Sequence, residues 1–510
     1  MASFYIPLTG LDADSTALNT IANDLSNMNT TAFKAQATNF SDLFYQQVGT
    51  SGSGNAVQVG EGVQVAANET NFTQGSIDST SVDTDAALNG NGFFVLNGGG
   101  SNIFTRAGDF SLASNGDLVT SDGLNVMGYP AVNGVVNTNA ALTAINIPEN
   151  QVEPPQATTT FGMTATLDSA TAVGGSMPSQ VQVYDSLGKS YEATVTYTNT
   201  GINAWSYSVT MPDTLTANTS TAAGVTTSLY NFGASGATQA TVSAGTNLAI
   251  TGPTATATAT ITPPTVVAGE SVAAYATALQ AAVTAANITG VTITSTAGGQ
   301  LSIVGTGITT TGSVIQDPVA SANATGTLTF DSSGNLVSPA TNVSGISFAG
   351  LSDGASTLNM TWDLLGPSGA PTISQVDATS SVSATNQNGY GSGEYQSFSI
   401  GSDGTVTATY SNGQKQSVGQ LALANVANLQ GLQDLGNSEY TTTLASGTAS
   451  VGASGTDGLG TLQGGAVEES NVNISAEFSD LIIAQRAFEA NSKAVTTFDT
   501  ITQETINMIH

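Results

Sequence analysis

The feature that most constrains this chain is a pair of seven-residue apolar repeats, one near each end of its 510 residues. A helix is expected over residues 8–28, and another over about 474–508. Apolar residues spaced by seven form one stripe along a helix, which is stable when it packs against another helix. The stripe residues are Leu11, Leu18, Ile21, Leu25 and Met28 in the first segment, and Phe478, Leu481, Phe488, Val495 and Phe498 in the second.

Polar residues dilute both stripes: Asp14 interrupts the first, and Gln485 and Ser492 interrupt the second. One interpretation is two ordinary terminal helices packed on a globular core. The other is that the two helices pair with each other and with helices of further copies. Because short isolated helices are marginal in water, such ends would become ordered on assembly. The repeats alone leave both interpretations open.

Between the two ends, the sequence is typical of strands and tight turns. Asn-Gly and Asp-Gly dipeptides between alternating or aromatic runs are strong hairpin signals. They occur at Asn91-Gly92, Asn115-Gly116, Asp122-Gly123, Asn133-Gly134, Asp403-Gly404 and Asn412-Gly413. The predicted fold class is therefore a multidomain, mainly β chain of discontinuous nested domains, with the terminal helices forming a paired, coiled-coil-like domain.

Two proline-containing stretches predict the crossings between domains, Pro148 to Pro155 and Gly366 to Pro371. If the chain leaves through the first and returns through the second, one part is inserted into another, which close strand ends permit. Within the insertion, Glu270–Asn287 has helical spacing in a stretch of simpler sequence. The predicted parts are 1–30 with 474–510 (inner helices), 31–147 with 372–473 (β-rich middle domain), 148–212 with 326–371 (inserted β domain), and 213–325 (an additional outermost domain).

Composition argues against several functional classes. The chain has 36 acidic and six basic residues, and its formal net charge of -30 repels nucleic acid and anionic lipid. It has no cysteine, and His510 is its only histidine. One chain therefore cannot build a thiolate site, a Ser-His-Asp triad or a multi-histidine metal site. We expect no catalytic residues, no cofactor, no metal and no nucleic-acid partner.

The sequence also gives no sign of a membrane span or of a cleaved signal. No apolar run approaches the roughly 20 residues that cross a bilayer. The first 20 residues lack the basic and apolar regions of a signal peptide. We expect no membrane insertion, and export by a route without a cleaved signal peptide.

Two acidic motifs are better explained as turns than as catalytic or calcium-binding sites. Glu468 and Glu469 are adjacent in sequence with no predicted partner across a cleft, and we interpret them as a solvated acidic turn. Residues 331–335 faintly resemble a calcium loop. They lack the later ligands of such a loop, so a simple turn is the better interpretation.

Motifs at both ends resemble those of the rod/hook family of flagellar axial proteins. Residues 30–34 are similar to its T-T-G-F-K motif, although Ala32 stands where glycine is usual, so the backbone of this turn could differ. Residues 91–95 and 104–110 are similar to G-x-G-F-F and Y-T-R-A-G-x-F, and residues 469–472 and 484–493 to E-x-S-N-V and A-Q-R-x-[YF]-x-A-N-[SA]-K. The residues that carry the resemblance are Phe33, Lys34, Gly92, Phe93, Phe94, Arg106, Gly108, Asn471, Gln485, Arg486 and Asn491.

Two other segments favour a hook protein over a rod protein. Residues 410–414 with 421–425 resemble the hook-type segment before the C-terminal helix, and residues 183–188 with Trp205 resemble the hook's inserted domain. Rod proteins of the family are much shorter and lack this insertion. The resemblance covers roughly residues 1–212 and 326–510, and leaves 213–325 unassigned.

The resemblance implies a structural subunit of the bacterial flagellar hook, located outside the cell. It implies export through the flagellar type III apparatus and polymerisation into a curved, flexible tube that couples the rod to the filament and transmits torque. The implied partners are further copies of the chain, the distal end of the rod, the hook cap during assembly, and the hook-filament junction protein. The alternatives are a distal rod protein, and another exported β-rich surface polymer or adhesin.

Overall fold

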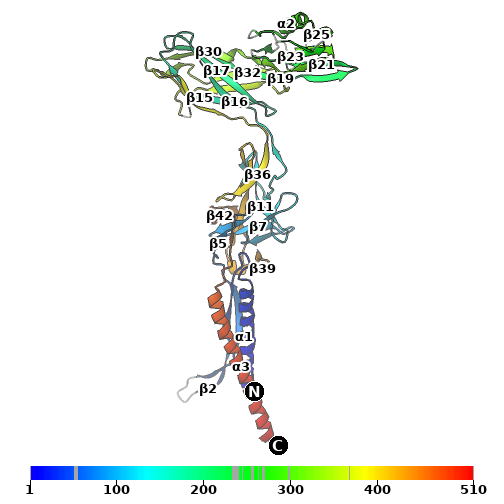
Figure 1. Ribbon diagram of the computed structural model, residues 1–510. Helices are drawn as coiled ribbons and strands as arrows, with labels where there is room; N and C mark the ends of the chain where they lie inside the picture. Colours follow the sequence, from blue (N-terminus) through cyan, green and yellow to red (C-terminus); the bar gives the residue numbers. More distant parts are fainter. Residues whose placement is uncertain are drawn as a thin grey trace. The chain divides into compact units, whose positions relative to one another are not determined.

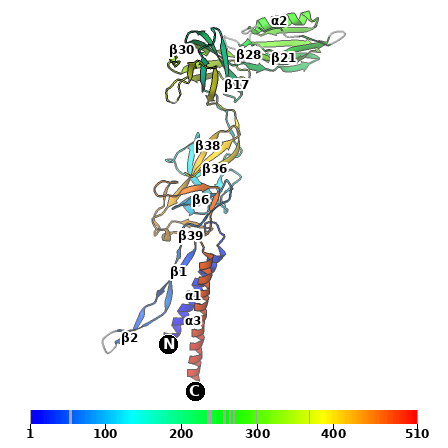
Figure 2. The ribbon, with the colours of Figure 1, turned by 60° about the vertical axis from the view of Figure 1, so that its left-hand side comes forward.

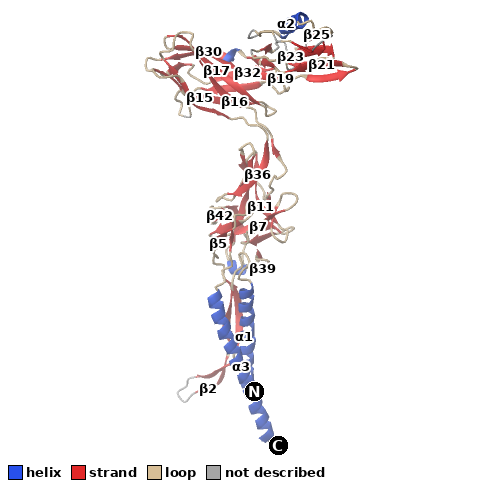
Figure 3. Cartoon of the chain, viewed as in Figure 1, coloured by secondary structure: helices blue, strands red, loops and turns tan. Residues whose placement is uncertain are grey.

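The computed structural model describes residues 2–50, 56–232, 240–243, 245–253, 258–261, 264–266, 270–296, 299–366 and 368–508. This part of the chain is mainly β with a helix at each end, as the sequence predicts (Figures 1 and 3). The chain divides into two compact units. Unit 1 is Met1–Gln151 with Glu394–His510, and unit 2 is Val152–Gly393.

The predicted helices form, with shifted ends. Helix α1 spans Ala2–Ser26, so it starts earlier than expected and ends before Met28. Helix α3 spans Ile474–Met508, and α2, in unit 2, spans Val272–Ala285. Ser271 caps α2 through its side chain, which accepts a hydrogen bond from the Ala274 N–H. The sole histidine lies outside the described residues.

The strands of unit 1 form a long hairpin next to α1 and a larger sheet. The hairpin pairs β1 (Gln36–Asp42) with β4 (Val63–Thr70), and β2 (Tyr45–Thr50) with β3 (Ala56–Gly60). The sheet runs in the order β36 (Gly393–Ile400), β37 (Thr405–Tyr410), β38 (Lys415–Asn425), β11 (Asn125–Val132), β7 (Phe93–Asn97), β8 (Asn102–Thr105), β40 (Glu439–Thr441) and β39 (Gln433–Gly436). Shorter strands complete the unit: β5 (Ile77–Ser79), β6 (Ala86–Asn89), β9 (Ser111–Leu112), β10 (Leu118–Val119), β12 (Val135–Val136), β13 (Thr143–Ala144), β41 (Ser450–Ala453), β42 (Thr461–Gly464) and β43 (Ala466–Glu468).

The core of unit 1 lies on both sides of strand β7. Phe94 and Leu96 belong to one buried cluster, while Phe93 and Val95 belong to another. Successive side chains of a strand point to opposite faces, so a run of four consecutive apolar residues requires a sheet covered on both sides. The Phe-Phe pair that stood out in the sequence is therefore explained by burial of both faces.

Unit 2 contains two separate hydrophobic cores. The first includes both tryptophans, Trp205 and Trp362. Its strands are β15 (Thr160–Asp168), β16 (Ser176–Tyr184), β17 (Ser190–Gly201), β18 (Ala204–Thr210), β29 (Val319–Ala320), β30 (Thr325–Phe330), β31 (Leu336–Ser338), β32 (Val343–Ala349), β33 (Leu358–Asp363), β34 (Ile373–Val376) and β35 (Ser381–Gln387).

The second core of unit 2 extends from Leu215 to Val314 and includes the apolar face of α2. The chain enters it through β19 (Asp213–Leu215) and leaves through β28 (Val314–Asp317), which pair antiparallel. The other strands of this part are β20 (Asn218–Ala222), β21 (Val225–Asn231), β22 (Thr241–Val242), β23 (Ala249–Pro253), β24 (Thr258–Thr260), β25 (Val291–Ser295), β26 (Gln300–Thr306) and β27 (Thr309–Thr311). The low-complexity stretch near 254–264 lies partly outside the described residues.

The return to unit 1 differs from the predicted one. Strands β34 and β35 pair with β15, so residues 372–393 belong to unit 2 and not to the middle domain. The Gly366–Pro371 stretch is a turn between β33 and β34, closed by a 2.8 Å hydrogen bond from the Gly366 N–H to the Ala370 carbonyl. Glycine and proline mark tight turns as well as linkers, and here they mark a turn.

Candidate functional site

The two terminal helices pack along each other in antiparallel directions (Figures 1 and 2). Asn491 of α3 donates a hydrogen bond from its Nδ2 to Oδ2 of Asp14 in α1, at 2.8 Å. Gly10 lies beside the same amide: a Cβ atom there would be 2.6 Å from Asn491 Nδ2. Asp14, which interrupts the apolar repeat, is therefore a specific contact between the helices.

The apolar repeats are only partly covered within one chain. On α1, Leu11, Leu18, Ile21 and Leu25 are half-buried, and Met28 lies beyond the helix end. On α3, Leu481, Val495 and Phe498 are half-buried, while Phe478 and Phe488 keep 53% and 38% of their surface exposed. Among the family-motif residues of α3, Gln485 and Arg486 are exposed and Asn491 is half-buried. The helix pair thus leaves much of its apolar surface uncovered.

The most buried face of α1 is small and polar. Gly10, Ala13, Thr20 and Asp24 are buried along it, and two of them, Thr20 and Asp24, contact the β1–β4 hairpin. Thr38 of β1 lies 3.1 Å from Thr20, side chain to side chain, and the Gln36 N–H donates to Asp24 Oδ2 at 2.8 Å. The hydrogen bonds between α1 and the hairpin therefore come from polar residues that carry no periodic signal.

Asp24 and Glu477 bring two carboxylates close together where α1 ends and α3 begins. Burial raises the pKa of Asp24, despite its hydrogen bond from Gln36. Burial also raises the pKa of Glu477, with a further contribution from the charges of Asp24 and Asp480. Oδ1 of Asp24 is buried and has no hydrogen-bond partner among the described residues. Protonation of either acid would relieve this repulsion.

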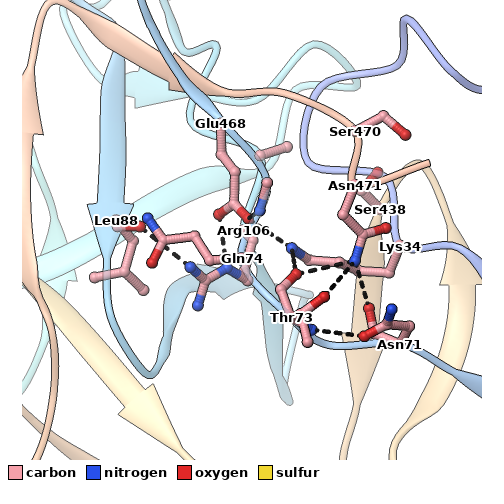
Figure 4. A network of polar contacts seen from close by, with 12 residues as sticks. Lys34, Asn71, Thr73, Gln74, Leu88, Arg106, Ser438, Glu468, Ser470 and Asn471 are labelled. Atoms are coloured by element: carbon pink, nitrogen blue, oxygen red, sulfur yellow. Dashed lines mark hydrogen bonds and ion pairs between the residues drawn. The ribbon is translucent and has the colours of Figure 1, made fainter. Parts of the chain in front are cut away.

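Next to the helices, a buried ion network joins segments from both ends of the chain (Figure 4). Glu468, fully buried in β43, pairs with Lys34 Nζ at 2.5 Å and with Arg106 Nε at 2.8 Å. Lys34 also donates to the Thr73 carbonyl at 2.9 Å, and the Gly75 N–H donates to Glu468 Oε1 at 2.8 Å. Burial lowers the pKa of Lys34, and the Glu468 charge acts in the opposite direction.

Arg106 uses its remaining donors on backbone carbonyls. It donates to Gly90 and Gly92 at 2.9 Å each, and to Leu88 at 3.1 Å. The guanidinium thus fixes the turn between β6 and β7 while neutralising Glu468. These hydrogen bonds, together with the Glu468 charge, offset the cost of burying the cation.

Asn471 holds the connection between β43 and α3. Its Oδ1 accepts from the Ala35 N–H at 2.8 Å, and its Nδ2 donates to the carbonyls of Asn71 and Thr73 at 2.8 and 2.9 Å (Figure 4). Phe33, whose carbonyl accepts from the Asn471 N–H at 3.3 Å, is half-buried. Three motifs that are far apart in sequence, around residues 34, 106 and 471, therefore meet at one junction.

The structure shows why glycine stands at motif position 108 and how alanine is accommodated at motif position 32. A Cβ atom on Gly108 would lie 1.7 Å from the Ala86 carbonyl oxygen, so only glycine fits. Ala32 adopts φ 53°, in the left-handed region, and its N–H donates to the Glu468 carbonyl at 2.8 Å. The alanine therefore takes the backbone conformation that glycine favours.

Glu468 is the residue that sequence reasoning missed. It was expected in a solvated turn, and that interpretation is wrong, because the side chain is completely buried between two cations. Only Glu469 of the pair is exposed. A weak signal was present: only six of the 510 residues are basic, and a motif Lys or Arg that becomes buried needs a carboxylate partner.

A groove of about 1000 Å³ opens beside the network and is lined by segments 69–74, 90–93 and 425–430. Its ionisable lining residues are Glu69 and Arg106, and Arg106 is already engaged by Glu468.

In the described residues, no group of three acidic, histidine or cysteine side chains is placed to hold a metal. No described helix is long and apolar enough to cross a membrane. The site is built to hold segments together.

Comparison with known families and proteins agrees with these motifs. The model "Flagellar hook protein FlgE/F/G D1 domain" matches residues 87–161, "Flagellar basal body protein FlaE D2 domain" matches 146–313 and 290–390, and "Flagellar basal body rod FlgEFG protein C-terminal" matches 463–508. Flagellar hook protein FlgE of Treponema pallidum (strain Nichols) is 29% identical over 535 residues, covering 100% of this chain and 99% of the relative. Its counterpart from Escherichia coli (strain K12) is 28% identical over 521 residues, covering 99% and 100%.

The matches run from end to end and include the segment 213–325 that the motifs left unassigned. The chain therefore belongs to the family of flagellar hook proteins.

Proposed function

We propose that this chain polymerises through its terminal helices into a curved, flexible tube that joins the flagellar rod to the filament and transmits torque. The observation that carries the proposal is the apolar surface left open on α1 and α3. Tyr5 and Leu8 of α1 are 55% and 47% exposed, and Ile482 and Ile483 of α3 are 50% and 64% exposed. An isolated soluble chain gains nothing from such a surface, whereas burial against neighbouring copies stabilises an assembly.

The buried network suits the transmission of torque. Glu468, in the strand before α3, pairs with Lys34 in the segment after α1 and with Arg106, which follows β8. A buried, hydrogen-bonded ion network resists rearrangement, because breaking one pair leaves a buried charge alone. We infer that this junction is a stiff joint between the helices and the sheet of unit 1.

The wider setting is also part of the proposal. We infer an extracellular location in the flagellar hook, reached through the type III export apparatus without a cleaved signal peptide. The partners would be the distal rod, the hook cap and the hook-filament junction protein. We infer no enzymatic activity, and we propose that residues 213–325, with their own core, form an additional outermost domain.

Electron microscopy of the purified full chain tests the proposal. Full-length protein should form curved tubes, while variants lacking residues 2–26 or 474–508 should remain soluble, with strand content retained by circular dichroism. A variant with residues 216–313 replaced by a short linker is the matched control, and should still polymerise. Straight tubes would favour the distal-rod alternative. Polymerisation of either helix-deleted variant would contradict the helix-based model.

A further inference from the structure

The six basic residues of the chain fall into two groups. Three are used inside the chain: Lys34 and Arg106 pair with Glu468, and Lys189 pairs with Asp213. The other three, Lys415, Arg486 and Lys493, have exposed side chains that form no ion pair with any described residue. Two of these three free cations lie on α3, seven residues apart.

Arg486 and Lys493 lie on the side of α3 that faces away from α1. Ala484, the buried residue of α3, and Asn491, which binds Asp14, mark the side that faces α1. At about 100° per residue, Arg486 is roughly 200° from Ala484, and Lys493 is likewise roughly 200° from Asn491. Ile501, 52% exposed, lies two turns beyond Lys493 toward the C-terminus.

The side of α1 that faces away from α3 carries an exposed acid, which is complementary in charge to the two cations of α3. Asp12 is an exposed carboxylate there, next to the exposed Tyr5 and Leu8. A shallow pocket of about 470 Å³ is lined by Tyr5, Leu8, Thr9, Leu11 and Asp12. One helix thus presents an acid beside an apolar notch, and the other presents two cations followed by an exposed isoleucine.

We infer that these two faces bind each other between adjacent copies, with Asp12 of one copy paired to Lys493 or Arg486 of the next. This inference rests on the proposed function and names its contact. The Asp14–Asn491 bond fixes the level of the two antiparallel helices, so that Asp12 is level with Lys493. Tyr5 and Leu8 are then level with residues 497–501, where Ile501 is exposed. A shift of one heptad, about 10 Å, brings Arg486 to Asp12 instead.

Net charge gives the contact a physical role. Each copy carries a formal charge of -30, so copies repel one another when they pack closely. A cation spared from internal pairing lowers this repulsion most where it meets a carboxylate of the neighbour. Because the two faces belong to different helices, the contact is heterologous and can repeat without closing, which generates a filament or a tube.

Chemical crosslinking of the assembled full chain tests the contact directly, because the natural sequence has no cysteine. We would prepare the double variants Asp12→Cys with Lys493→Cys, and Asp12→Cys with Arg486→Cys, and treat assembled protein with a short bismaleimide. One of the two should give a ladder of covalent multimers, and the position that reacts reports the register. Each single variant alone should give no ladder, and Asp12→Cys with Lys415→Cys is the matched control.

Charge reversal provides the second measurement. Asp12→Lys should slow polymerisation at low ionic strength at least several-fold, and combining it with Lys493→Glu or Arg486→Glu should restore the rate. Tubes that form normally but give no ladder with either pair would overturn this contact and leave the proposed function intact. A full chain that forms no tubes would overturn both.

Discussion

The Nζ atom of Lys34 lies 2.5 Å from Oε1 of Glu468, a residue 434 positions later in the chain. Both side chains are fully buried, and the second carboxylate oxygen binds Arg106. One carboxylate therefore compensates two buried cations, one of them in the segment that follows α1. The stability of unit 1 should depend on this carboxylate more than on any exposed acid.

Replacing Glu468 by glutamine should destabilise unit 1 by about 3–5 kcal/mol, since it leaves two buried cations uncompensated. Hydrogen exchange at the Ala35 amide, which binds Asn471, should accelerate accordingly. Tryptophan fluorescence should report unchanged unfolding of unit 2, which contains both tryptophans. Glu469→Gln, at the exposed neighbouring position, is the control. Equal effects of the two substitutions would show that the ion network does not stabilise the junction.

Glycine at position 32 should be tolerated better than glycine at a buried alanine of ordinary backbone conformation. Ala32→Gly removes a buried methyl group but relieves a left-handed conformation that costs an L-residue roughly 1–2 kcal/mol. Ala466→Gly, at a fully buried position in strand β43, removes the same group without that relief. Calorimetry should therefore find Ala466→Gly the more destabilising by about 1 kcal/mol or more. The reverse order would contradict the assigned backbone conformation.

Glu439 should make unit 1 less stable as the pH rises from about 4.5 to about 7. Burial, together with the charge and hydrogen bond of Asp122, raises the pKa of Glu439 from 4.5 to about 7. Between these values the folded chain holds a proton that the unfolded chain has lost, so stability falls with rising pH. Glu439→Gln should flatten this dependence in denaturation curves of unit 1. Glu394→Gln, an exposed acid of the same sheet, should leave the slope unchanged.

Asp353→Asn should raise the melting temperature of unit 2 at neutral pH. Burial and the neighbouring Asp185 raise the pKa of Asp353, and Lys189 only partly opposes them. Removing one charge of this pair relieves repulsion, and the gain should shrink as the pH falls and Asp353 takes up a proton. Tryptophan fluorescence can follow the transition, with Asp377→Asn as an exposed control. A gain that persists unchanged at pH 3 would argue against a charge effect.

The sequence predicted those features that local pattern controls. Seven-residue apolar spacing located α1 and α3, and helical spacing located α2, whose Val272, Tyr275, Leu279 and Val283 are all buried. Asn-Gly and Asp-Gly turns predicted a mainly β middle. These signals are short-range, so they can be read without knowing which strands pair.

Features that depend on distant pairing were missed. Nothing next to Glu468 in the sequence announces Lys34 or Arg106, so its burial could not be anticipated. The Gly366–Pro371 stretch has the composition of a linker, and only the pairing of β34 and β35 with β15 identifies it as a turn. The contact of α1 with the hairpin uses Thr20 and Asp24, whose polar side chains resemble those of an exposed face.

The long separation of Lys34 from Glu468 also sets an order for folding. Lys34 and Glu468 lie 434 positions apart, so their ion pair can form only when nearly all of the intervening chain is available. Any chain interrupted before position 468 would keep Lys34 and Arg106 without their carboxylate. Copies that lack position 468 would therefore carry two uncompensated cations at the junction, which should be less stable for that reason.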